Sequence, residues 1–135
     1  MRFSILILVV LFMVGTSAAQ ATPRDAIELY FKAHALGNGD YIRQAFAPDA
    51  RIAFVENGQL KEWTREEYAG RFTGPANDES GRVRRVERLD IHGTAASAVL
   101  TLDYPQVVFT DHLSLLKIGD QWKIVNKVFS ADRKP

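Results

Sequence analysis

Residues 109–129 read FTDHLSLLKIGDQWKIVNKVF, and this stretch decides the fold. Gly119-Asp120 forms a two-residue connection with the glycine that tight hairpin turns require, and an apolar segment lies on each side of it. The stretch therefore predicts two antiparallel β-strands joined by a short turn.

Pairing Ile118 with Gln121 sets the register of this hairpin. The later pairs follow from it: Leu115 with Ile124, Leu113 with Asn126, and Asp111 with Val128. One face then carries alternate residues of both strands: Phe109, Asp111, Leu113, Leu115, Trp122, Ile124, Asn126 and Val128. Asp111 and Asn126 are diagonal neighbours on this apolar face. A buried carboxylate needs a partner, so this polar pair either satisfies itself or meets a ligand.

Residues 1–21 have the features of a targeting segment. Arg2 supplies a short positive region, and residues 3–14 form an apolar run that is too short for a transmembrane helix. Small residues at 17–19 and again at 19–21 fit the pattern that signal peptidase recognises, with cleavage after Ala19 or Ala21. We expect an exported protein, periplasmic or secreted, that has no membrane anchor after cleavage.

Removal of residues 1–21 leaves 114 residues (135 minus 21), the size of one domain, residues 22–135. Only Arg2 of the 17 Lys and Arg residues is lost, which leaves 16 basic against 16 acidic residues. A net charge near zero gives no electrostatic reason to expect nucleic acid as a partner. The chain has no cysteine and three histidines, so we expect no disulfide, no metal site and no cofactor.

The first helix is predicted from Thr22, as N-cap, to about Leu36. Pro at the first helical position and an acid three residues after the cap support this start, and the Gly-rich residues 37–39 support the end. Its core-facing stripe recurs at helical spacing: Ile27, Tyr30, Phe31 and His34. A histidine or tyrosine on such a stripe usually makes a structural hydrogen bond, although both can also serve a pocket.

The remaining elements are predicted from caps, turns and alternation. Residues 40–72 give a helix from an Asp40 cap to Phe46, a strand at 50–56, an Asn57-Gly58 turn, a strand at 59–63, and a helix at 64–72 with a capping box. A loop at 73–81 follows, then strands at 82–91 and 95–104, and the chain ends in a polar, disordered tail at 130–135. The loop could close over a pocket, but an ordinary surface loop is favoured. Hairpin geometry sets Arg84 opposite Asp103, and parity lets Arg85 or Glu87 reach into a cavity, but a solvated, salt-bridged strand is favoured.

Three helices in the N-terminal half, followed by antiparallel strands, predict an α+β fold. A strongly curved sheet closing over the first helix would form a cone with a pocket inside it.

The order of elements, with YFKAHALGNGDYIRQAFAPDARI at 30–52 and the hairpin motif at 109–129, resembles the nuclear transport factor two-like superfamily. Within it, Phe-Thr-Asp at 109–111, Leu-Ser-Leu-Leu-Lys at 113–117, Gly119 and Trp-Lys-Ile-Val-Asn-Lys at 122–127 resemble the lumazine-binding-like group, which has SnoaL-like relatives. The resemblance covers nearly all of residues 22–135.

This resemblance implies a small-molecule pocket lined by residues from several elements: Tyr30, His34, Phe46, Phe54, Trp63, Tyr68, Asp111 and Asn126. It also implies a homodimer that packs through the convex face of the sheet. Residues with outward parity in the last hairpin fit such an interface because they are apolar: Val108, Leu116, Val125 and Phe129.

The superfamily contains binding proteins and enzymes, so the fold does not decide the function. We favour a binding module for a pterin- or flavin-like heterocycle, with Asp111 and Asn126 meeting its polar groups. The alternative is an isomerase, dehydratase or cyclase in which Asp111 is the base and Tyr30 or His34 donates to the developing oxyanion. In a third hypothesis, Asp111 and Asn126 are a structural pair in a non-catalytic dimer.

Overall fold

The computed structural model describes residues 20–135, so all but the last two residues of the predicted export segment lie outside the described part of the chain. The elements, in chain order, are α1 (Pro23–Leu36), α2 (Gly39–Ala45), β1 (Phe46–Glu56), β2 (Gln59–Thr64), α3 (Arg65–Ala69), β3 (Val83–His92), β4 (Ala95–Tyr104), β5 (Val107–Ile118) and β6 (Gln121–Arg133). Within the described residues, no helix has the length and apolar character needed to cross a membrane.

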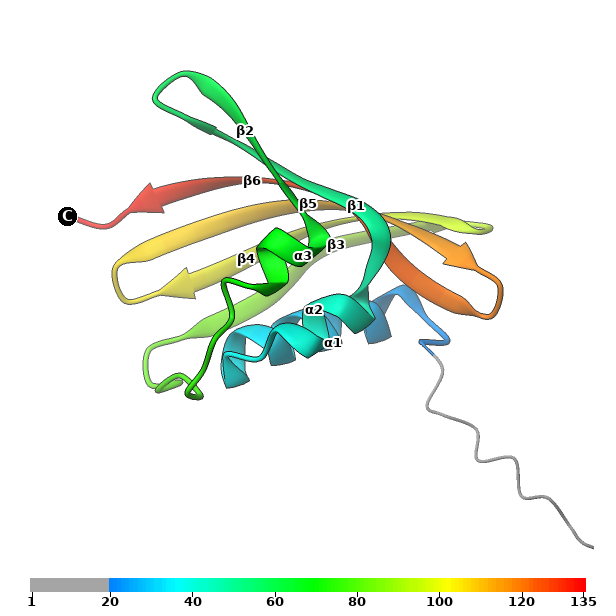
Figure 1. The fold of residues 1–135 in the computed structure, drawn as a ribbon, viewed down its shortest axis with the longest axis horizontal. Helices are drawn as coiled ribbons and strands as arrows, with labels where there is room; N and C mark the ends of the chain where they lie inside the picture. The colour runs from blue at the N-terminus through cyan, green and yellow to red at the C-terminus, as the bar shows by residue number, and fades with distance from the viewer. Residues whose placement is uncertain (1–19) are drawn as a thin grey trace, which may run out of the picture.

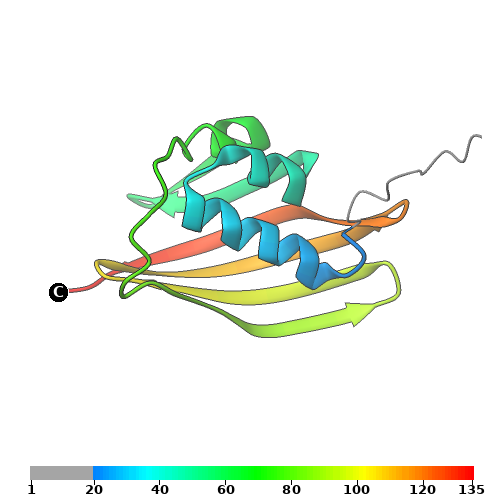
Figure 2. The ribbon, with the colours of Figure 1, turned by 90° about the horizontal axis from the view of Figure 1, so that it is seen from below.

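The six strands form one sheet in the order β2-β1-β6-β5-β4-β3. Neighbouring strands are antiparallel except β1 and β6, which are parallel. The sheet is strongly curved, and α1 and α2 lie against its concave side (Figure 1, Figure 2). The predicted α+β fold with a curved sheet and three helices in the N-terminal half is confirmed.

Helix α1 begins and ends where its sequence predicts. The side chain of Thr22 accepts a hydrogen bond from the backbone N–H of Asp25, and the carboxylate of Asp25 accepts one from the N–H of Thr22. Gly37 ends the helix with φ 60°, in the left-handed region that glycine tolerates best. Asn57 and Gly58 also have positive φ, as the predicted hairpin turn between β1 and β2 requires.

Several boundaries differ from the prediction. The N-cap of α2 is Asn38, whose side chain accepts from the N–H of Asp40, and α3 ends at Ala69. Strand β1 begins at Phe46, because this residue pairs with Ile124 of β6. The predicted tail at 130–135 is also wrong, since β6 continues to Arg133. Residues 130–133 pair with residues 107–110 of β5, which satisfies their backbone groups in the ladder.

A one-residue bulge at Glu87 changes the register of the hairpin between β3 and β4. His92 pairs with Ala95 as the turn predicts, but beyond the bulge Arg84 pairs with Leu102 instead of Asp103. Neither Arg85 nor Glu87 lines the main cavity, and the favoured prediction of a solvated, salt-bridged strand is confirmed. These two side chains form an exposed ion pair with 3.0 Å between Nε and Oε1.

The loop at residues 73–81 is fixed to the end of α1. The side-chain amide of Asn77 donates to the carbonyl of His34, and its backbone N–H donates to the carbonyl of Ala35. These bonds satisfy carbonyl groups that a helix leaves free at its C-terminus. None of the residues 73–81 lines the main cavity, which fits the ordinary surface loop that the sequence favours.

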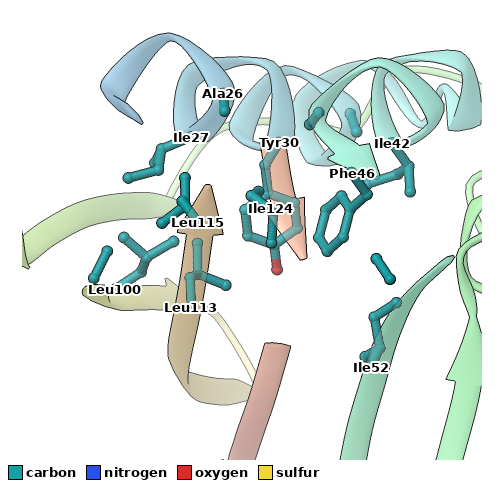
Figure 3. Packing of buried hydrophobic residues seen from close by; sticks show 14 of the residues in the cluster. Ala26, Ile27, Tyr30, Ile42, Phe46, Ile52, Leu100, Leu113, Leu115 and Ile124 are labelled. Carbon is teal, nitrogen blue, oxygen red and sulfur yellow. The ribbon is translucent and has the colours of Figure 1, made fainter. Parts of the chain in front are cut away.

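The core lies between α1, α2 and the concave face of the sheet. Its largest fully buried side chains come from both layers: Tyr30, Phe46, Ile27, Ile42, Ile52, Leu100, Leu102, Leu115 and Ile124. Figure 3 shows Tyr30 reaching from α1 between these side chains with its hydroxyl directed away from the helix. The polar partner of that hydroxyl lies on the sheet and defines the candidate site.

Candidate functional site

A bulge in β6 decides which side chains face the interior. Leu115 pairs with Ile124 as predicted, but Ser114 pairs with Asn126, so Val125 is an extra residue on β6. Because side chains alternate along a strand, one extra residue exchanges the two faces beyond it. Lys127 therefore lies on the inner face.

The same bulge corrects three further predictions. Asn126 and Val128 lie on the outer face, where they line a shallow groove with His112. Phe129 was predicted on the outer face and instead lies inside, opposite Asp111. The predicted diagonal pair of Asp111 and Asn126 does not form, and the partner of Asp111 is Lys127.

Lys127 and Asp111 form a buried ion pair. The distance from Nζ to Oδ2 is 3.1 Å, and the exposed fraction is 4% for the lysine side chain and 0% for the aspartate. The ammonium group also donates to the hydroxyl oxygens of Tyr30 and Tyr68, at 2.5 Å and 2.9 Å. The ammonium group therefore has a counter-charge and two hydrogen-bond acceptors, which is the condition under which a buried charge is tolerated.

The hydrogen-bond directions in this cluster leave the Tyr68 proton in a long bond that a ligand acceptor can replace. Tyr30 donates its hydroxyl proton to Oδ2 of Asp111 at 2.6 Å and accepts from Lys127. Tyr68 accepts from Lys127, and its only acceptor among the described residues is the Tyr30 oxygen at the longer distance of 3.2 Å. Because Tyr68 also lines the cavity, its O–H can turn toward a ligand acceptor. The cluster thus presents Tyr68 as a donor polarised by a neighbouring charge.

The electrostatics of the cluster keep Lys127 charged and Tyr30 neutral. Burial lowers the pKa of Lys127, but the charge of Asp111 and the interaction with Tyr68 outweigh this effect and raise it above its ordinary value. Burial, together with the charge of Asp111, raises the pKa of Tyr30 well above 10. At neutral pH the floor of the site is therefore a compensated ion pair beside the neutral hydroxyl of Tyr30.

A cavity of about 880 Å³ opens above this cluster. Its residues come from α1, the β1–β2 hairpin, the segment 68–72, the start of β5 and the C-terminal half of β6; their arrangement can be followed in Figure 1. The walls are largely aromatic: Phe54, Trp63, Phe72, Phe109 and Phe129. The volume is within the range of ordinary small-molecule sites, roughly 300–1,000 Å³.

The predicted pocket residues are only partly brought together. Five of them line the cavity: Tyr30, His34, Phe54, Trp63 and Tyr68. Phe46 is fully buried behind it and packs against the rings of Tyr30 and Tyr68. Asp111 lies beneath the floor without exposed surface, and Asn126 is on the opposite face of the sheet.

Lys127, Arg71 and Phe129 also line the cavity and were missed from the sequence. Lys127 ends the Trp-Lys-Ile-Val-Asn-Lys motif, but strict alternation from the turn placed it outside. The sequence did hold a signal for the bulge: strict alternation placed Phe129, a large aromatic side chain, on the outer face, where it was assigned to a dimer interface instead of the cavity.

His34 is the second polar group of the wall. Its ring contacts Tyr30, Phe72 and Tyr104, and its Nε2 is buried with no hydrogen-bond partner among the described residues. Burial lowers the pKa of His34 well below 6.5, and the charges of Lys127, Arg84 and Arg82 act in the same direction. His34 is therefore neutral at physiological pH and can donate or accept one hydrogen bond from a ligand.

Comparison with known proteins places this geometry in a family. The family model described as "Putative lumazine-binding" matches residues 18–130. No curated protein matches the chain.

Among solved structures, an NTF2-like protein of unknown function from Shewanella baltica has a TM-score of 0.75 at 24% identity, with 83% of this chain and 92% of that chain covered. One from Methylobacillus flagellatus has a TM-score of 0.68 at 27% identity, covering 82% and 89%. A "putative ketosteroid isomerase" from Shewanella frigidimarina has a TM-score of 0.55 at 20% identity, covering 80% and 94%.

Proposed function

Because the chain belongs to the "Putative lumazine-binding" family of the NTF2-like superfamily, we propose that it binds a small organic ligand in the cavity above Lys127. The observation that carries this proposal is the combination of largely aromatic walls with a small polar floor. Apolar walls supply most of the binding energy of such sites, and a few placed polar groups select the ligand. Here those groups are Tyr68 and His34.

The ligand class that suits this lining best is a planar, partly polar heterocycle of the pterin or flavin kind. Its rings would lie between the aromatic walls, and a ring carbonyl or nitrogen would accept the proton of Tyr68. His34 could match either a donor or an acceptor on the same ring system. This assignment gives Tyr68 and His34 the role that was expected of Asp111 and Asn126.

Fluorescence titration of residues 20–135 with lumazine and riboflavin tests the proposal. Trp63 lines the cavity while Trp122 is buried in the core, so ligand entry should quench mainly Trp63. Tyr68→Phe removes the hydroxyl donor of the floor and should weaken binding about 2- to 10-fold, the range for a single hydrogen bond. Tyr41→Phe is the matched control, since that tyrosine lies on α2 away from the cavity and contacts Lys32.

Absence of saturable binding by either compound at about millimolar concentration, the weak limit of useful affinity, would refute the proposed ligand class. Equal effects of the two tyrosine substitutions would refute the role of Tyr68.

Proton abstraction by Asp111, the enzymatic alternative, has less support from the geometry. The carboxylate has no exposed surface, and one oxygen is held by Lys127 and Tyr30. A general base must reach the proton that it removes, within hydrogen-bond distance or through one water. Asp111 instead fixes the position of Lys127, which in turn polarises Tyr68.

We further propose that the outer face of the sheet packs against a second copy of this chain. Val55 and Leu60 are each 71% exposed and, with Val128, line a groove of about 490 Å³ on this side. Leu116 adds a further exposed apolar side chain with outward parity. Light scattering should give twice the chain mass, and Val128→Lys should halve it. Val83→Lys, at the far edge of the sheet, is the control, and a monomeric wild type would refute the proposal.

Export of the protein is also a proposal. It is supported by the apolar run and small residues at 3–21, which form a signal-peptide pattern. Fractionation of cells that express the full chain with a C-terminal tag tests it. Recovery of unprocessed chain in the cytoplasm alone would contradict export.

A further inference from the structure

Arg71 holds a fixed position at the mouth of the cavity. It follows α3, where its backbone N–H donates to the carbonyl of Tyr68, and its guanidinium carbon lies 4.1 Å from the centre of the Trp63 ring. A guanidinium that rests on an aromatic face keeps its N–H groups directed outward in its own plane. Those donors are the part of an arginine that binds carboxylate or phosphate in two parallel hydrogen bonds.

These donors have no partner within the described part of the protein. Arginines elsewhere, such as Arg43, Arg84 and Arg88, have a carboxylate oxygen within 2.7–2.9 Å. Among residues 20–135, no carboxylate lies within 4.0 Å of the guanidinium nitrogens of Arg71 or Arg133. Both of these arginines line the cavity.

Arg133 lines the same cavity from β6. Lys127, Phe129, Ala131 and Arg133 alternate on the inner side of β6, and all four line the cavity. Two acidic residues, Glu56 and Asp132, also line the mouth. Asp132 has the outward parity of its strand, whereas Glu56 has the inward parity of Phe54; neither carboxylate lies within 4.0 Å of the guanidinium nitrogens of Arg71 or Arg133.

The floor of the cavity does not require a charged ligand. The charge of Lys127 is compensated by Asp111 at 3.1 Å, and Tyr68 and His34 are matched by neutral polar groups. Selection for charge therefore depends on the mouth, where Arg71 is the side chain with a fixed position and free donors.

We propose that the ligand carries an anionic group, a carboxylate or a phosphate, at the end that remains at the mouth, and that Arg71 binds this group. The inference rests on the proposed function, since it names the chemistry of the ligand in the same cavity. Its aromatic body lies against the walls, and its charged end lies beside Trp63, with Arg133 as a second, weaker contact.

Two matched pairs of probes test this inference: riboflavin with flavin mononucleotide, and 2-naphthamide with 2-naphthoate. Each pair keeps one ring system and differs in the anionic group. Wild-type protein should bind the anionic member about 3- to 10-fold more tightly, as expected for a charge-assisted contact at a solvent-exposed mouth. The preference should fall as salt is raised from 20 to 500 mM, values chosen to shorten the screening length several-fold.

Arg71→Gln should remove the preference and leave affinity for riboflavin and 2-naphthamide unchanged. Arg51→Gln is the matched control because Arg51 is exposed, does not line the cavity and has no carboxylate partner among residues 20–135. Neutral probes that bind as tightly as the anionic ones, or a preference that survives Arg71→Gln, would overturn the inference while the binding function stands. If no probe binds, the proposed function fails and the inference with it.

Discussion

The buried pair of Asp111 and Lys127 provides the sharpest test of how this site is built. Removal of one partner leaves an uncompensated charge in a site with 0–4% exposure. We therefore expect Asp111→Leu and Lys127→Met each to lower the free energy of unfolding by about 3–5 kcal/mol. For a domain of this size, this corresponds to a fall in Tm of roughly 12–20 °C, at about 4 °C for each kcal/mol.

The double variant should behave differently. Replacement of both charged groups by apolar side chains of similar volume leaves no buried charge, and the hydroxyls of Tyr30 and Tyr68, 3.2 Å apart, can still bond to each other. We expect the double variant to lose only about 0–2 kcal/mol, well below the sum of the two single losses. Urea denaturation of the four proteins at pH 7 measures the coupling energy. Single losses below about 1 kcal/mol, or a double loss equal to their sum, would refute the reasoning.

The pH dependence of stability follows from the same cluster. The pKa values of Lys127 and Tyr30 are raised in the folded protein, so the folded state holds these protons more tightly than the unfolded chain does. Their contribution is present below the unfolded pKa values, about 10, and is lost as the pH rises through the folded values. Alkaline unfolding should therefore be steeper above pH 10 in the wild type than in a Tyr30→Phe/Lys127→Met variant.

Burial holds the pKa of His34 in the folded protein below 6.5, so below that pH the unfolded chain binds a proton that the folded protein does not. The free energy of unfolding should therefore fall by up to about 1.4 kcal/mol for each pH unit below 6.5. His34→Leu should remove this slope in urea titrations between pH 7.5 and 5. Gly39→Ala places a Cβ 2.3 Å from the carbonyl oxygen of Ala69, so it should lower the free energy of unfolding by about 1–3 kcal/mol. An unchanged Tm would contradict this contact between α2 and α3. The carbonyl of Gln20 accepts from the N–H of Trp122 at 2.8 Å, so we expect export to cleave before this residue; an intact mass that lacks it would contradict the expectation.

The local elements could be predicted because their signals are short-range. Thr22 and Thr64 are N-caps with complete capping boxes, and Asn57-Gly58 is a hairpin turn. These patterns depend on neighbours within four residues, and the sequence contains all of them. The parallel pairing of β1 with β6, by contrast, joins residues far apart in the chain and has no local signal.

The candidate site could be predicted only in part. The inward positions of Asp111 and Tyr30 follow from alternation and helical spacing, and the family resemblance implied that Trp63 and Tyr68 line the pocket. The partner of the carboxylate could not be obtained in that way. Alternation from the turn counts every residue once, so a single bulge reverses every assignment beyond it.

Two such bulges shape the interior, and each brings a basic side chain inward. The extra residue Val125 moves Lys127 to Asp111, and the extra residue Glu87 moves Arg84 to the hydroxyl of Tyr104 at 2.9 Å. Strict alternation would leave both cations in water and the Asp111 carboxylate buried without a counter-charge, which is far more costly than a bulge. The bulge at Val125 therefore supplies the counter-charge that allows a buried carboxylate to lie beneath an aromatic cavity. In a sequence of this fold, a carboxylate that strict alternation buries without a counter-charge therefore predicts a bulge in a neighbouring strand.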